Sequence, residues 1–163
     1  MNEQNNIINI DKDILSNDEI EYIKVLAKKP IFNKVIMSQE YFDKAITELK
    51  NDYIINKILS YLYEKYNMKL ICKLAQIQTW VPDSVSEEHI HRCGGRDNTE
   101  YNFIIYLNDD YEGGELFLPD YGIKIKPIKG LSVLFNGKNI KHGVTKIKKS
   151  NRYGLILWCS KTN

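Results

Sequence analysis

The sequence is poor in the features that mark membrane, secreted and nucleic-acid-binding proteins. Twenty-three lysine and arginine residues stand against 21 aspartate and glutamate residues, so the formal net charge is +2. This balance gives no reason to expect a nucleic acid or a membrane as partner. No apolar run approaches the roughly 20 residues of a membrane-spanning helix. Residues 1–4 lack the basic and apolar stretches that begin a signal peptide, so we expect no secretion.

Cysteine is scarce as well. The three cysteines, Cys72, Cys93 and Cys159, are odd in number and widely spaced. Disulfide frameworks need paired cysteines and an oxidising compartment. We therefore predict reduced thiols and a cytoplasmic location.

The chain does contain enough apolar residues, 43% of 163, to build the core of one domain. We predict a single domain over residues 1–163. Within it, residues 1–66 are expected to form a helical support. Residues 67–163 are expected to form a β-rich core that carries the candidate site.

The N-terminal part has helical signals. Ser16 and Glu19 form a capping box, in which each side chain can accept a hydrogen bond from the backbone N–H of the other. The apolar spacing after it predicts a helix that ends near Lys28 and Lys29, with Pro30 as the stop. Helical spacing also predicts a second helical stretch over about residues 38–66, with a break near residues 51–52.

After residue 67 the pattern changes to short apolar runs separated by glycine, asparagine and aspartate. These runs predict strands over residues 69–80, 102–107, 115–118, 123–128, 131–135, 143–147 and 152–159. Many short strands with such turns are typical of an antiparallel barrel or sandwich. The expected fold is therefore α+β and mainly β, with the N-terminal helices packed against the outside of one β-barrel.

The three histidines of the chain all lie among these predicted strands. His89 and His91 are one residue apart, so their side chains share a face of an extended strand. His142 comes late in the chain. Two paired imidazoles and a distant third suit iron, zinc, copper or nickel. A single histidine is more often structural or exposed, so the neighbouring residues must decide between the two interpretations.

An ordered series of motifs surrounds the histidines. In chain order they are Trp80-Val81-Pro82-Asp83 before His89-Ile90-His91, Asn102-Phe103-Ile104-Ile105-Tyr106-Leu107-Asn108-Asp109 before Glu112-Gly113-Gly114-Glu115-Leu116, Ile125-Lys126-Pro127, Gly130, Leu134-Phe135, His142-Gly143-Val144, Arg152 and Trp158. With this series, residues 71–158 resemble the iron(II)- and 2-oxoglutarate-dependent dioxygenases. The resemblance is to the prolyl 4-hydroxylase-like branch in particular.

The resemblance implies a double-stranded β-helix, or jelly-roll, and a hydroxylase that uses Fe(II) and 2-oxoglutarate, with ascorbate as a candidate reductant. It implies that His89 and His142 are the first and last iron ligands. It also implies that Arg152 and Tyr106 bind the distal carboxylate of 2-oxoglutarate, a task that suits the two-pronged guanidinium. Trp80 and Trp158 match aromatic positions that line the cosubstrate pocket. The substrate, a small molecule or a protein side chain, is not readable from the sequence.

The sequence departs from this family at the second iron ligand. The family has an acid there, whereas this chain has His91. One hypothesis is that His91 is a true ligand and the site contains three histidines. A second is that Glu87, Glu88 or Asp97 completes the site instead. A third shifts the register, so that His91 and Cys93 form the pair.

Other classes of function stay open at this point. One is a three-histidine metal dioxygenase that does not use 2-oxoglutarate, and another is a non-catalytic β-barrel binding module. The nucleic-acid demethylase branch is disfavoured, because it carries a second arginine six residues after the first and this chain has Trp158 there. Residues 92–100, polar and beside the site, are a candidate substrate lid.

Overall fold

The computed structural model describes residues 8–27, 35–37, 40–42, 44–91 and 99–162. In these ranges the chain forms helices α1 (Asn17–Leu26) and α2 (Asp52–Tyr66) and the short 3-10 helix η2 (Pro119–Tyr121). The strands are β1 (Ile8–Lys12), β2 (Val35–Met37), β3 (Glu40–Phe42), β4 (Lys44–Glu48), β5 (Leu70–Trp80), β6 (Ser86–His89), β7 (Tyr101–Tyr106), β8 (Leu116–Leu118), β9 (Ile123–Ile125), β10 (Leu131–Phe135), β11 (His142–Val144) and β12 (Arg152–Lys161).

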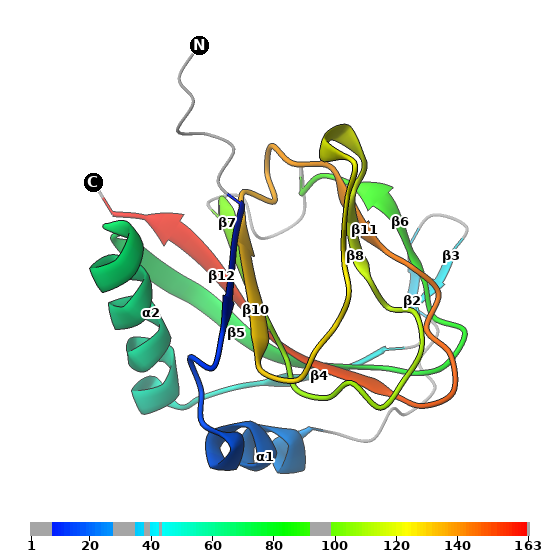
Figure 1. The fold of residues 1–163 in the computed structure, drawn as a ribbon, viewed down its shortest axis with the longest axis horizontal. Helices are drawn as coiled ribbons and strands as arrows, with labels where there is room; N and C mark the ends of the chain where they lie inside the picture. The colour runs from blue at the N-terminus through cyan, green and yellow to red at the C-terminus, as the bar shows by residue number, and fades with distance from the viewer. Residues whose placement is uncertain (1–7, 28–34, 38–39, 43, 92–98, 163) are drawn as a thin grey trace.

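The strands form two main antiparallel sheets (Figure 1). A six-stranded sheet has the order β1-β10-β7-β12-β5-β4, and a four-stranded sheet has the order β6-β11-β8-β9. Helix α2 lies against the outer side of the large sheet, away from the small one (Figure 1). Strands β2 and β3 pair with each other. This arrangement matches the predicted mainly β fold with helices on its outside.

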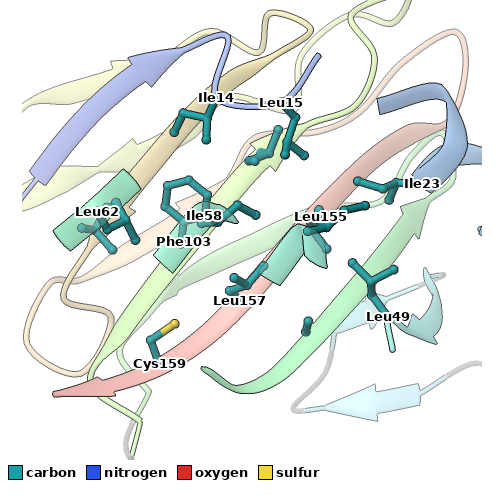
Figure 2. Packing of buried hydrophobic residues seen from close by; sticks show 14 of the residues in the cluster. Ile14, Leu15, Ile23, Leu49, Ile58, Leu62, Phe103, Leu155, Leu157 and Cys159 are labelled. Carbon is teal, nitrogen blue, oxygen red and sulfur yellow. The ribbon is translucent and has the colours of Figure 1, made fainter. Parts of the chain in front are cut away.

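Strand β12 separates two cores because successive side chains of a strand point to opposite faces. Leu155, Leu157 and Cys159 belong to the core that the sheet shares with the helices (Figure 2). Ile156 and Trp158 face the other way and pack with residues of the small sheet. The space between the two sheets therefore has its own lining, and the candidate site residues of β12 lie on that side.

The first helix begins as the sequence predicted. The Ser16 N–H donates to Glu19 Oε2 at 2.7 Å, and the Glu19 N–H donates to Ser16 Oγ at 3.2 Å, which confirms the capping box. Helix α1 ends at Leu26, before the predicted stop, with Ala27 as its C-cap. Lys28, Lys29 and Pro30 lie outside the described residues.

The prediction of a helical stretch over residues 38–66 was wrong in its first half. Only the part after Asn51 is helical, and the Asn51 side chain caps α2 by accepting from the Ile54 N–H at 3.1 Å. The segment before it forms β3 and β4, and β4 pairs with β5 along its whole length. Its apolar spacing fits a helix, but the open edge of β5 offers a ladder of backbone hydrogen bonds that local spacing does not reveal.

Strand β1 was also missed. It pairs with β10 in register from Ile8 opposite Phe135 to Lys12 opposite Leu131. The N-terminal part of the chain thus supplies two edge strands to the large sheet as well as helices. In the described ranges no helix is both long enough and apolar enough to cross a bilayer.

An ionic contact ties β1 to the end of α2. The buried Asp11 carboxylate accepts hydrogen bonds from Lys65 Nζ and Tyr66 Oη. Burial raises the pKa of Asp11, but the hydrogen bonds from Lys65 and Tyr66 outweigh it, so the pKa is held below its usual value. The carboxylate therefore favours the folded state while it is ionised.

We expect Asp11→Asn to lower the free energy of unfolding by about 1–3 kcal/mol at pH 7, because two hydrogen bonds to a charged acceptor are weakened. Since the folded state depresses this pKa, the stabilisation is fully present above the unfolded pKa of about 3.9 and is lost as pH falls from there through the lower pKa of the folded state. Urea unfolding at pH 7, 5 and 3 should show the difference between variant and wild type shrinking toward pH 3. The exposed Asp120→Asn serves as control, and a pH-independent difference would contradict the prediction.

Candidate active site

Three histidines from two distant parts of the chain lie together between the sheets. One ligand atom from each of His89, His91 and His142 lies within 4.8 Å of the others. His89 and His142 are directly opposite each other in the pairing of β6 with β11. His91 follows β6 and is held by its backbone N–H, which donates to the Gly137 carbonyl at 2.9 Å. Its Nε2 atom lies 3.2 Å from Nε2 of His142.

The second ring nitrogen of each histidine is hydrogen-bonded to an oxygen. Nδ1 of His142 lies 2.9 Å from the Ile140 carbonyl oxygen, and Nδ1 of His89 lies 2.9 Å from that of Glu87. A carbonyl oxygen can only accept, so each Nδ1 carries the proton. Nδ1 of His91 is likewise paired with Asn102 Oδ1 at 3.0 Å. The unprotonated nitrogen of each ring is therefore Nε2, and imidazole nitrogens of this kind are the donors that bind a first-row metal.

The surroundings of His142 keep its ring uncharged, and aromatic rings pack against His91 and His142. Burial lowers the pKa of His142 to about 4, an effect that the bond to the Ile140 carbonyl opposes and the nearby His89 reinforces. His142 is thus neutral at pH 7 and needs to lose no proton to bind a metal. The Trp158 ring lies 4.7 Å from that of His91, and the Phe135 ring lies 4.7 Å from that of His142.

Gly137 makes room for the bond between His91 and Asn102. A Cβ atom at this position would lie 2.0 Å from Asn102 Oδ1 and 2.7 Å from His91 Nδ1. Any side chain there would displace one of the two partners. Neither Asn102 nor Gly137 was identified as a site residue from the sequence, although Asn102 begins one of the motifs that carry the resemblance.

None of the alternative ligands joins this cluster in the part of the chain that the structure describes. Glu87 and Glu88 are exposed, and a Glu88 carboxylate oxygen lies 3.6 Å from Lys141 Nζ. The candidate ligands Asp97 and Cys93 lie outside the described residues, as does most of the predicted lid. Among described histidine, cysteine, aspartate and glutamate side chains, the three histidines form the only group suited to a metal.

A buried cation lies on the same inner face of the large sheet. Arg152 is 1% exposed, and its Cζ atom lies 5.6 Å from the centre of the Trp80 ring and 5.1 Å from that of Tyr106. No carboxylate among the described residues pairs with it. Trp80 and Tyr106 thus present aromatic faces to a guanidinium that lacks a counter-ion in these ranges.

Three buried polar atoms in this region have no hydrogen-bond partner in the described part of the chain. They are Nε of Arg152, the hydroxyl of Tyr106 and the hydroxyl of Tyr111. A buried donor without a partner is costly, by about 1–3 kcal/mol and more for a charged group. A cation and two hydroxyls in this condition are suited to an anionic ligand that accepts from all of them.

Unlike these three atoms, the indole N–H groups of Trp80 and Trp158 have hydrogen-bond partners, which are glutamines of β5. Trp80 Nε1 donates to Gln78 Oε1 at 3.1 Å, and Trp158 Nε1 donates to Gln76 Oε1 at 3.2 Å. The glutamines were not identified as site residues from the sequence. A signal was present, since Gln76, Gln78 and Trp80 share one face of a strand that is buried on both faces.

Gly154 leaves open space on the same inner face. It lies between Arg152 and Ile156 on β12 and opposite both Gln78 and Tyr106. A Cβ atom there would touch only the Ile105 carbonyl oxygen, at 3.7 Å. Apart from the chain neighbours of Gly154, no side-chain atom of the described residues lies within 4 Å of the position that this Cβ atom would take.

Comparisons with known proteins agree with this geometry. A profile of the 2OG-Fe(II) oxygenase superfamily matches residues 75–160. Human prolyl 3-hydroxylase 2 is 35% identical over 65 residues, which cover 36% of this chain and 9% of that protein. This chain thus matches only a small part of its curated relatives.

Solved structures show the same fold. The viral collagen prolyl hydroxylase of Paramecium bursaria Chlorella virus-1, in complex with 2-oxoglutarate, superimposes with a TM-score of 0.72 at 20% identity, over 96% of each chain. A 2OG-Fe(II) oxygenase family oxidoreductase from Burkholderia pseudomallei gives 0.75 at 16% identity, over 99% of this chain and 87% of its own. The predicted double-stranded β-helix is confirmed. With a profile match over more than half its length, the chain belongs to the 2OG-Fe(II) oxygenase superfamily, the dioxygenases that use iron(II) and 2-oxoglutarate.

Proposed function

We propose that this protein is a prolyl hydroxylase-like dioxygenase whose iron is held by His89, His91 and His142. The observation that carries the proposal is the common orientation of the three imidazoles. Each donates from Nδ1 to an oxygen of the protein, which leaves three Nε2 lone pairs at one place. Such outer hydrogen bonds orient metal-binding histidines and raise their basicity.

The cosubstrate site proposed here is the buried region around Arg152. The guanidinium and the Tyr106 hydroxyl would bind the distal carboxylate of 2-oxoglutarate, because both are buried and Arg152 Nε and the hydroxyl have no partner among the described residues. Trp80 and Trp158 would line the pocket as rigid walls, held by the two glutamines of β5. Gly154 has no side chain and would keep the inner face of β12 clear next to Arg152.

When iron(II) and 2-oxoglutarate are bound, they supply the oxidation, in which O₂ converts the oxo acid to succinate and carbon dioxide and one oxygen atom enters a substrate C–H bond. The protein would supply the metal ligands and the buried groups that orient the cosubstrate. Since His91 stands where relatives have an acid, the protein ligands contribute no negative charge. With Arg152 nearby, the site depends on the dianionic cosubstrate for its charge balance.

The substrate is proposed only as a class. The structural relatives are named for the hydroxylation of prolyl residues, so a prolyl residue in a peptide is the first substrate to test. A small molecule with an exposed C–H bond is the second. We place the enzyme in the cytoplasm, because Cys72 and Cys159 are opposite each other in the sheet and yet are free thiols.

A second candidate function follows from the absence of an acid in the ligand set. A dioxygenase with three histidines could bind iron without using 2-oxoglutarate. Arg152 would then bind another anion. A titration with iron(II) and then 2-oxoglutarate separates this candidate from the main proposal.

We expect anaerobic addition of iron(II) and then 2-oxoglutarate to produce the visible metal-to-ligand charge-transfer band of the ternary complex. His142→Ala and His91→Ala should each abolish it, because a ligand is lost. His91→Asp should keep it, because a carboxylate is the usual ligand of this class at that position. Absorbance spectra and bound-iron analysis of the four proteins provide the measurement.

The other outcomes of this titration are also informative. Iron retained without a band would favour the dioxygenase that does not use 2-oxoglutarate. No iron and no band in the wild type would indicate a non-catalytic barrel. A band that survives in His91→Ala would show that His91 is not a ligand.

We further expect Asn102→Leu to weaken iron(II) binding by about 10- to 100-fold, because the His91 ring loses the acceptor that orients it. Asn102→Asp should restore binding, since its carboxylate also accepts from Nδ1. Competition with a chelating dye under anaerobic conditions measures both affinities. Equal affinities in the wild type and in Asn102→Leu would contradict a role for this bond.

A further inference from the structure

Tyr111 lies beside the proposed cosubstrate site, but no motif in the sequence marked it. It is on the connection between β7 and β8 and is 9% exposed. Its ring packs with Trp80, Val144 and Ile147. Its hydroxyl is one of the three buried polar atoms that have no partner among the described residues.

The Tyr111 ring and the stem of Arg152 are neighbours. A Cβ atom at Gly114 would lie 2.8 Å from Tyr111 Cε2 and 3.1 Å from Arg152 Cδ. The two side chains therefore come together over a position that has to be glycine, and whose φ of +67° also favours glycine. Burial raises the pKa of Tyr111, and the positive charge of Arg152 opposes the rise. The Tyr111 hydroxyl is thus protonated and can donate a hydrogen bond close to the positive charge of Arg152.

The connection that carries Tyr111 is held on both sides. Before it, the Asn108 amide donates to the Asn151 carbonyl at 2.8 Å and accepts from the Tyr153 N–H at 2.7 Å. After it, Glu112 exchanges two backbone hydrogen bonds with Lys148, at 3.1 and 2.8 Å. These bonds tie the connection to the residues on either side of Arg152. The position of Tyr111 relative to the guanidinium is therefore set before any ligand arrives.

We propose that the Tyr111 hydroxyl is a third donor to the distal carboxylate of the cosubstrate, beside Arg152 and Tyr106. The inference rests on the proposed cosubstrate site. A carboxylate offers about four lone-pair positions. The guanidinium can fill two of them, and the two tyrosine hydroxyls fill the others. The distal carboxylate would then accept from all three buried groups that have no partner among the described residues.

The test is Tyr111→Phe, which removes one oxygen atom and keeps the ring. In the iron(II)-loaded protein without oxygen, we expect the affinity for 2-oxoglutarate to fall by about tenfold to a hundredfold, the usual range for a hydrogen bond to a charged group. The affinity for 2-oxopentanoate, which has the same chain length but no distal carboxylate, should stay unchanged. The metal-free variant should unfold at the same temperature as the wild type or higher, because a partnerless buried hydroxyl has been removed.

Two further variants complete the experiment. Tyr106→Phe should show the same selective loss, and Tyr53→Phe, at a residue 69% exposed on α2, should show none. If the wild type fails to bind 2-oxoglutarate, the proposed function fails and this inference with it. If the wild type binds, the inference alone is overturned in two cases. One is that Tyr111→Phe binds 2-oxoglutarate normally, and the other is that it loses affinity for both oxo acids equally.

Discussion

The pairing of β12 with β5 on one side and β7 on the other is the constraint on which the rest of the structure depends. Because this strand is central and extended, its side chains alternate between two environments. One set, including Leu155 and Leu157, packs against the helices. The other set begins with Arg152 and ends with Trp158, and it lines the space between the sheets. A single strand thus joins the apolar core to the candidate site, and both strand neighbours hold it in register.

The interior between the sheets contains buried polar side chains beside its apolar cluster, and these polar groups differ in how their hydrogen bonds are satisfied. The indole N–H groups of Trp80 and Trp158 donate to glutamines of β5, so donor and acceptor both belong to the protein. These hydrogen bonds hold the two indole rings in place. Each histidine ring of the site donates from Nδ1 to an oxygen of the protein, so its unprotonated nitrogen is Nε2. Around Arg152, the donors without partners suggest that a ligand completes the hydrogen bonding. The orientation of the histidine rings indicates where a metal would bind. The buried donors without partners near Arg152 indicate where an anion would bind.

The proposed ligand set contains three histidines, with His91 where the sequence resemblance places an acid. A histidine in place of the acid removes one negative charge and adds a ring that itself needs orientation. The bond from His91 to Asn102 meets that need, and it is possible only because residue 137 is glycine. Three separate positions are therefore adapted to one another at this ligand. A metal site with three neutral ligands next to a buried arginine favours anionic ligands more than a site with a carboxylate would.

The sequence by itself determined the features that depend on local order. The spacing of His89 and His91, the capping box of α1 and the short strands from residue 69 onward follow from periodicity and turn residues. The position of Arg152 after His142 follows from the ordered motifs. Tertiary structure alone decided the contacts between distant segments. Strands β1 and β4 exist because sheet edges were open to them, and Asn102, Gly137 and Tyr111 gain their roles from neighbours far away in the chain. The physical reason is that periodicity records which face of an element is buried, whereas hydrogen-bond partners and close approaches arise only when elements pack together.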